Sequence, residues 1–232
     1  MKRALTFAGA LATTAFGSYD FQPTPVAAAP QKDWSQTVVA TPEGGFRMGN
    51  PAAKVKLVEY GSLTCPHCAH FSAEAKGPLA AYVKSGKVSF EFRNYVLNGI
   101  DVTATLLARC APPSKFFALT DRLYATQSSW VGKISGLSQA EKDRLKTLPS
   151  GQRLGRLADV GGLTQLAAAG GVSPARGKQC LADEAALDRL GKMGEAAAAL
   201  GVQGTPTFFL NGQMLGVNEW AQIEPLIRQA GG

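Results

Sequence analysis

Residues 64–71, TCPHCAHF, contain two of the four cysteines and both histidines of this 232-residue chain. The Cys65-x-x-Cys68 spacing occurs in zinc sites, haem attachment sites and thiol redox centres. Haem attachment requires a histidine directly after the second cysteine, and Ala69 occupies that position. A structural zinc site usually takes a second Cys or His pair from elsewhere in the chain, and the sequence offers none beyond His70. We therefore predict no metal site and favour a thiol redox centre.

Local chemistry assigns different roles to the two thiols. Pro66 suits the first turn of a helix, where its missing N–H costs nothing. Cys65 would then be an exposed, attacking thiolate stabilised by the helix start, and Cys68 the more buried resolving thiol. A protonated His67 would lower the pKa of Cys65 further and make the disulfide oxidising. A purely structural disulfide is the alternative, but a two-residue loop gains little from cross-linking.

The flanking sequence predicts strand, helix and strand in that order. KVKLVEY (54–60) alternates as a strand does, and KVSFEFRNYV (87–96) is a second long strand. Between them a helix should begin at Pro66, and Gly77-Pro78 should kink or interrupt it. A short strand is expected at QTVVAT (36–41).

Strand signals vanish from about residue 98 to residue 192, where short helical segments alternate with Pro, Gly and Ser. Two strands then flank Asn211-Gly212, a strong hairpin turn, and a helix closes the chain. We predict an α/β fold in which residues 36–97 and 193–232 form one domain, interrupted by a helical insertion at 98–192.

The N-terminus has the features of an export signal. Lys2 and Arg3 precede an apolar run of about 13 residues, which is too short to span a bilayer, and small residues follow. We predict a cleavable signal peptide at 1–28, a leader at 29–35 and a periplasmic protein; an uncleaved anchor or a disordered tail is the alternative. The net charge is +7, but the sequence contains no run of Lys and Arg. A spread-out positive charge of this kind disfavours nucleic-acid binding.

CPHC after VKLVEYGS, the helical block and the late GTPTFFLNG together resemble the DsbA-like branch of the thioredoxin fold over residues 36–232. The resemblance implies that Cys65 is the nucleophile and Cys68 the resolving cysteine. It implies that Pro206 is a cis-proline beside them, and that the backbone of Thr205 binds an extended substrate peptide. An ordinary trans proline at a strand start is the alternative for Pro206.

Glu59 lies six residues before Cys65, where the family carries a buried acid beneath the disulfide. The resemblance implies that it takes or relays the proton of Cys68 during exchange. The alternative is a surface acid that pairs with Lys54 or Lys56.

Cys110 and Cys180 both fall in the predicted helical insertion. Some DsbA-like proteins carry a second disulfide of this kind, and an oxidising compartment would favour it. We expect a structural Cys110–Cys180 disulfide, and two buried free thiols are the alternative.

The resemblance implies a thiol:disulfide oxidoreductase that needs no cofactor and introduces disulfides into exported proteins. Its substrates would be unfolded or folding proteins with free cysteines, and a DsbB-type membrane partner would reoxidise it. Thr205 replaces the valine common in the best-known oxidases, and threonine also occurs there in isomerase-like relatives. A disulfide isomerase or reductase and a peptide-binding chaperone with the same fold are therefore the alternatives.

Overall fold

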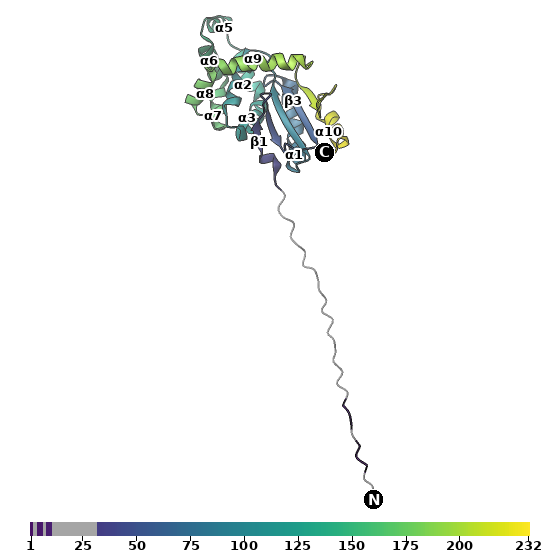
Figure 1. Ribbon diagram of the computed structural model, residues 1–232. Coiled ribbons are helices and arrows are strands. Elements are labelled where there is room, and N and C mark those ends of the chain that lie inside the picture. The colour runs from purple at the N-terminus through teal and green to yellow at the C-terminus, as the bar shows by residue number, and fades with distance from the viewer. Residues whose placement is uncertain (2–3, 7, 11–31) are drawn as a thin grey trace. The chain divides into compact units, whose positions relative to one another are not determined.

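A six-stranded sheet lies at the centre of residues 32–232 in the computed structural model (Figure 1). The structure describes residues 1, 4–6, 8–10 and 32–232, so most of the predicted signal peptide and residues 29–31 of the leader lie outside the described residues. The strand order is β1-β2-β4-β3-β5-β6. The strands are β1 (Val38–Ala40), β2 (Phe46–Gly49), β3 (Val55–Gly61), β4 (Val88–Asn94), β5 (Thr207–Leu210) and β6 (Gln213–Met214).

Strand β3 is the central strand that leads to the CPHC motif. It pairs in parallel with β4 and antiparallel with β5. Its alternation places Leu57 and Glu59 on one face of the sheet and Tyr60 on the other. The predicted strands at 54–60 and 87–96 are confirmed. Strand β2 was not predicted. It is short and lies between glycine-rich turns, which hide its strand pattern.

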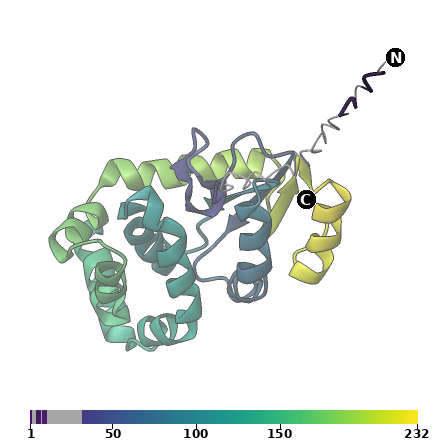
Figure 2. The same ribbon diagram turned by 90° about the horizontal axis from the view of Figure 1, so that it is seen from below.

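Helices cover both faces of the sheet and form the segment between β4 and β5. They are η1 (Trp34–Gln36), α1 (Pro66–Lys84), α2 (Gly99–Cys110), α3 (Pro113–Ala125), α4 (Gln127–Ser135), α5 (Gln139–Lys146), α6 (Ser150–Gly161), α7 (Leu163–Ala169), α8 (Pro174–Leu181), α9 (Glu184–Ala199) and α10 (Trp220–Gln229). Figure 2 shows α9, in light green, on one side of the sheet, and α1 with the yellow α10 on the other. The α/β architecture with a helical insertion is as predicted.

Helix α1 continues through Pro78, so an interruption at Gly77-Pro78 is wrong, and the alternative of a kink there stays a prediction. Pro78 lies on the exposed face of the helix, where water can bind the backbone carbonyl that lacks its N–H partner. The opposite face is buried through its whole length by Cys68, Phe71, Ala75, Leu79 and Val83, and this packing holds the helix together.

The predicted end of the insertion at residue 192 lies inside α9, which continues to Ala199. Helix α9 thus crosses from the insertion to the sheet, and its C-terminal turn packs Ala197 in a small cluster with Tyr60 and Val202. The division of the chain into domains stays a prediction.

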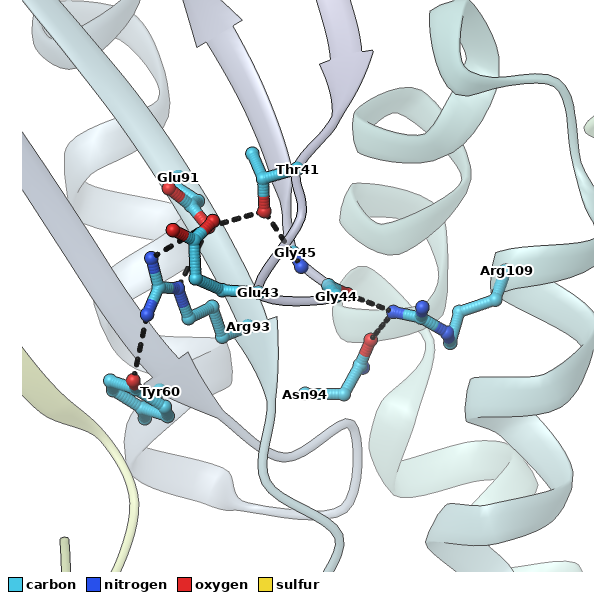
Figure 3. Close-up of polar contacts among 9 residues, drawn as sticks. All are labelled: Thr41, Glu43, Gly44, Gly45, Tyr60, Glu91, Arg93, Asn94 and Arg109. Carbon is cyan, nitrogen blue, oxygen red and sulfur yellow. Dashed lines mark hydrogen bonds and ion pairs between the residues drawn. The ribbon is translucent and has the colours of Figure 1, made fainter. Parts of the chain in front are cut away.

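Arg109 ties the insertion to the sheet (Figure 3). Its guanidinium, near the end of α2, donates hydrogen bonds to the Gly44 carbonyl at 2.8 Å and to Asn94 Oδ1 at 3.2 Å. It also stacks over Phe46, 5.2 Å from the ring centroid. Burial lowers the pKa of Arg109 to about 10, and the charge of Arg189 adds to this effect. One side chain thereby fixes the β1–β2 turn and the end of β4 against α2.

A second polar network in Figure 3 ties the β1–β2 turn to β3 and β4. Glu91 is buried and accepts hydrogen bonds from the Thr41 hydroxyl and from Arg93 Nε, both at 2.7 Å. Arg93 also donates to the Tyr60 hydroxyl at 2.9 Å. Because each buried polar group has a partner, the network fixes the register of these strands without an unpaired charge.

Candidate active site

Cys65 and Cys68 lie at the start of α1, beside the loop that follows β3. Cys65 is the N-cap residue, and Pro66 is the first residue of the helix. Both cysteines are thiols in the structure. Cys65 is 5% exposed and Cys68 is fully buried, so the expected exposed position of Cys65 is wrong although the order of exposure is as predicted. Cys65 Sγ lies 3.2 Å from the carbonyl oxygen of Thr205, the residue before Pro206.

Hydrogen bonds to sulfur lower the pKa of Cys65 to about 5. The largest contribution comes from the side chain of Cys68, and burial opposes it. The Thr205 hydroxyl and the backbone N–H groups of Cys68 and His67 add to the lowering. The backbone N–H of His67 is one of these donors, and its side chain is exposed; the expected effect of a protonated imidazole stays a prediction. At neutral pH, Cys65 is a thiolate.

The pKa values of Cys68 and Glu59 are raised, whereas that of Cys65 is lowered. Burial raises the pKa of Cys68 well above its ordinary value, and the hydrogen bond to Cys65 and the charge of Glu59 raise it further. Glu59 is 2% exposed, and burial followed by the charge of Cys65 raises the pKa of its carboxyl. The alternative of a surface acid paired with lysine is therefore wrong. A buried carboxyl with a raised pKa thus lies beside the thiol that must gain or lose a proton.

The loop at residues 61–65 is held from the insertion by Asp101, which lies in the first turn of α2 and is fully buried. Its carboxylate accepts hydrogen bonds from Ser62 Oγ at 2.6 Å and from the Leu63 and Leu97 backbone N–H groups at 3.0 Å. Burial raises the pKa of Asp101, and these hydrogen bonds oppose the rise.

Gln127 and Tyr124 hold the carbonyl groups of the same loop. The amide nitrogen of Gln127 donates to the Leu63 carbonyl at 2.9 Å and to the Cys65 carbonyl at 3.0 Å. The Tyr124 hydroxyl donates to the Ser62 carbonyl at 3.2 Å. Sequence reasoning missed Asp101, Gln127 and Tyr124. Asp101 and Gln127 each stand near the start of a helix, as many polar residues do. Nothing near them in the sequence points to the cysteines.

The Thr205–Pro206 peptide bond is cis, and Pro206 is buried beside the redox pair. When Cys65 is protonated, its thiol donates a hydrogen bond to the Thr205 carbonyl at 3.2 Å. The Thr205 hydroxyl is buried and has no hydrogen-bond partner among the described residues. It is thus free to donate to Cys65 when that sulfur is a thiolate. The structure places both residues where the resemblance puts them.

The remaining predicted residues lie away from the redox pair. A disulfide joins Cys110 on α2 to Cys180 on α8, with their Cα atoms 6.1 Å apart. His70 is exposed and pairs with Glu74 at 3.3 Å, one turn further along α1. Within the residues that the structure describes, no three His, Cys, Asp or Glu side chains cluster as metal ligands would. The same part of the chain contains no helix long and apolar enough to cross a bilayer.

The fold and the site define a C-x-x-C dithiol protein in which a helical insertion supports the reactive loop. The family model described as thioredoxin matches residues 41–229. The chain belongs to the thioredoxin family.

Solved structures refine this assignment. A protein-disulfide isomerase from Novosphingobium aromaticivorans is 34% identical, with a TM-score of 0.75, over 82% of this chain and 98% of that chain. The alpha-DsbA1 protein of Wolbachia pipientis is 22% identical, with a TM-score of 0.64, over 79% of this chain and 89% of that one. The second likeness concerns the fold alone, and the expected DsbA-like fold is confirmed.

Curated relatives from Rickettsia species are longer proteins. The Rickettsia bellii relative is 29% identical over 173 residues, which cover 73% of this chain and 58% of the relative. The Rickettsia conorii relative is 30% identical, over 73% of this chain and 54% of its own length. The chain thus spans little more than half the length of the curated relatives it matches.

Proposed function

We propose that this protein is a thiol:disulfide oxidoreductase that acts as a dithiol oxidase on exported proteins. The observation that carries the proposal is the contrast between the two thiols. Cys65 has its pKa lowered to about 5, whereas the pKa of Cys68 is raised well above normal. Such a pair favours a reduced state with one thiolate, which makes its disulfide a good oxidant. The similarity to the Novosphingobium protein-disulfide isomerase supports thiol–disulfide chemistry.

The reaction begins from the disulfide form. A substrate thiolate attacks Cys65 Sγ, forms a mixed disulfide and breaks the bond to Cys68. Cys68 leaves with the electron pair and takes a proton from Glu59, whose buried carboxyl is poised to give it. The second substrate thiolate then attacks the substrate sulfur of the mixed disulfide, and Cys65 leaves as a stabilised thiolate. The substrate has lost two electrons, and the protein holds them as a dithiol.

The cellular setting is part of the same proposal. A periplasmic location rests on the signal-like sequence of residues 1–28 and on the Cys110–Cys180 disulfide, since structural disulfides persist in oxidising compartments. The substrates would be exported proteins with free cysteines. A DsbB-type membrane partner would accept the two electrons and restore the Cys65–Cys68 disulfide.

Disulfide isomerisation is the second candidate. It is favoured by the name of the Novosphingobium relative and by Thr205, whose buried hydroxyl lies beside Cys65. An isomerase must be kept reduced, because it attacks substrate disulfides with its own thiolate.

Equilibration of the Cys65–Cys68 pair with glutathione distinguishes the two functions. A reduction potential near about −120 mV supports the oxidase, and one near roughly −200 mV or lower supports the isomerase or a reductase. Cys65→Ser is the control, and a peptide-binding chaperone would retain its activity in that variant. Failure of the wild type to exchange disulfides with glutathione or with a reduced peptide contradicts the whole proposal.

A further inference from the structure

Ser62 follows the last residue of β3 and is 1% exposed, and the mechanism proposed above gives it no part. Its side chain is fixed from the insertion, because Ser62 Oγ donates a 2.6 Å hydrogen bond to the buried carboxylate of Asp101. The same oxygen accepts from the Thr64 N–H at 3.1 Å, and the Ser62 carbonyl accepts from the Cys65 N–H at 3.2 Å. The serine is therefore held in one orientation between β3 and the start of α1.

The backbone N–H of Ser62 points away from β4. The Gly61 carbonyl accepts from the Tyr95 N–H, so Gly61 faces β4. Because successive residues of a strand direct their backbone hydrogen-bonding groups to opposite sides, Ser62 directs its N–H to the β5 side. Strand β5 begins at Thr207, which pairs with Tyr60, so β5 has no residue opposite Ser62. Among the described residues, no backbone oxygen accepts this N–H.

The acceptor for this N–H is the sulfur of Cys68, which is fully buried. Burial raises the pKa of Cys68, and the backbone N–H of Ser62 opposes that rise. Buried N–H groups almost always have a partner, and a hydrogen bond to an ionised acceptor is about twice as strong as one to a neutral acceptor. The N–H groups that lower the pKa of Cys65 come instead from His67 and Cys68. The two sulfurs thus have separate backbone donors.

We propose that the Ser62 N–H stabilises the thiolate of Cys68 each time the redox disulfide opens or closes. Asp101 is a positioning residue, since its hydrogen bond to Ser62 Oγ holds that N–H on the sulfur. The step rests on the proposed function: an attacking thiolate forms a bond to Cys65 Sγ and breaks the bond to Cys68. Cys68 leaves with the electron pair and carries a negative charge until it takes up a proton.

A donor to this short-lived thiolate changes rates and leaves the equilibrium in place. In the reduced protein Cys65 carries the charge and Cys68 keeps its proton, so the Ser62 N–H contributes little to the stable states. The same thiolate leaves when the disulfide opens and attacks when it closes, so both rates depend on the N–H equally. A hydrogen bond to a charged group is worth about tenfold in rate.

Dithiothreitol is the probe, because it reduces a C-x-x-C disulfide whether the protein acts as an oxidase or as an isomerase. Stopped-flow reduction of the oxidised full chain measures opening, and mixing the reduced chain with oxidised glutathione measures closing. Ser62→Ala removes the bond to Asp101 and should slow both about tenfold. The reduction potential and the rate at which iodoacetamide alkylates Cys65 should stay at wild-type values. Ser89→Ala, the same change at a 2% exposed serine of β4, should leave both rates unchanged.

Asp101→Asn is the second variant. It leaves a single accepting oxygen for the Ser62 hydroxyl and for the Leu63 and Leu97 N–H groups, so it should slow opening and closing as well. Because both changes act through one contact, the double variant should be no slower than the slower single variant.

The outcomes separate this role from a structural one. Wild-type rates in a folded Ser62→Ala overturn the proposal. Equal slowing in Ser89→Ala, a shifted reduction potential or slower alkylation of Cys65 also overturns it, because each shows a general loosening of the site. If Ser62→Ala does not fold, Asp101→Asn decides on the same readouts. A wild type that dithiothreitol reduces but that exchanges disulfides with no peptide loses the proposed function, and the Ser62→Ala comparison still decides this one.

Discussion

Lowering the pH through the pKa of Cys65 should remove a large part of the stability of the reduced protein. The pKa is about 5 in the folded chain and roughly 8.5 in an unfolded one. Because the folded pKa is the lower of the two, the folded form gains stability as it ionises. The gain is complete above the unfolded pKa and is lost as the pH falls through about 5.

The magnitude follows from the distance between pH and pKa. In the folded chain, pH 7 lies about two units above the pKa of Cys65, so the thiol is ionised. In the unfolded chain the same thiol is still mostly protonated at pH 7. Each unit is worth about 1.36 kcal/mol, so the thiolate contributes about 2.7 kcal/mol at pH 7 and almost nothing at pH 4. The same free energy raises the reduction potential of the pair by roughly 60 mV. Cys65 is 5% exposed, so solvent screening takes little from this value.

Guanidinium unfolding of the reduced protein at pH 4 and pH 7 measures the effect, with reduced Cys65→Ser as the control that cannot ionise. From pH 4 to pH 7, the free energy of unfolding of the wild type should rise by about 2.7 kcal/mol more than that of the control. Absorbance of the thiolate near 240 nm should titrate with a midpoint near 5 in the wild type alone. A gain below about 1 kcal/mol, or a midpoint above roughly 7.5, refutes the assignment of a stabilised thiolate.

Three further changes test the surroundings of the site. Glu59→Gln should slow the steps that protonate or deprotonate Cys68 about 100-fold in stopped-flow reduction, while iodoacetamide still alkylates the first thiol at the wild-type rate; equal slowing of both contradicts the relay. Replacing Cys110 and Cys180 by alanine opens a separation of 70 residues and should lower the free energy of unfolding by about 4 kcal/mol; a loss under about 1 kcal/mol argues against a structural role. Gln127→Leu leaves two loop carbonyls unpaired and should cost about 2 kcal/mol with faster amide exchange in the loop; slow exchange there shows that the loop does not depend on it.

The sequence alone determined the features that depend on neighbouring residues. Three elements were predictable because their signals act within a few residues. Alternation marks the strand at 54–60, the missing N–H of Pro66 marks the start of a helix, and a tolerance of positive φ marks the hairpin at Asn211-Gly212. Ala69 in place of a histidine and the lack of a second Cys or His pair also favoured thiol redox chemistry over haem or zinc.

Tertiary structure alone decided what surrounds the thiols. Asp101 reaches the Leu63 backbone across 38 residues and Gln127 reaches it across 64, so no local pattern marks either one as part of the site. Thr205, whose carbonyl lies 3.2 Å from Cys65 Sγ, likewise comes from a segment 140 residues away. The pKa of a thiol or an acid depends on desolvation and on hydrogen bonds from whatever the fold brings near it. Those groups come from distant parts of the chain, and only the packed structure shows which they are.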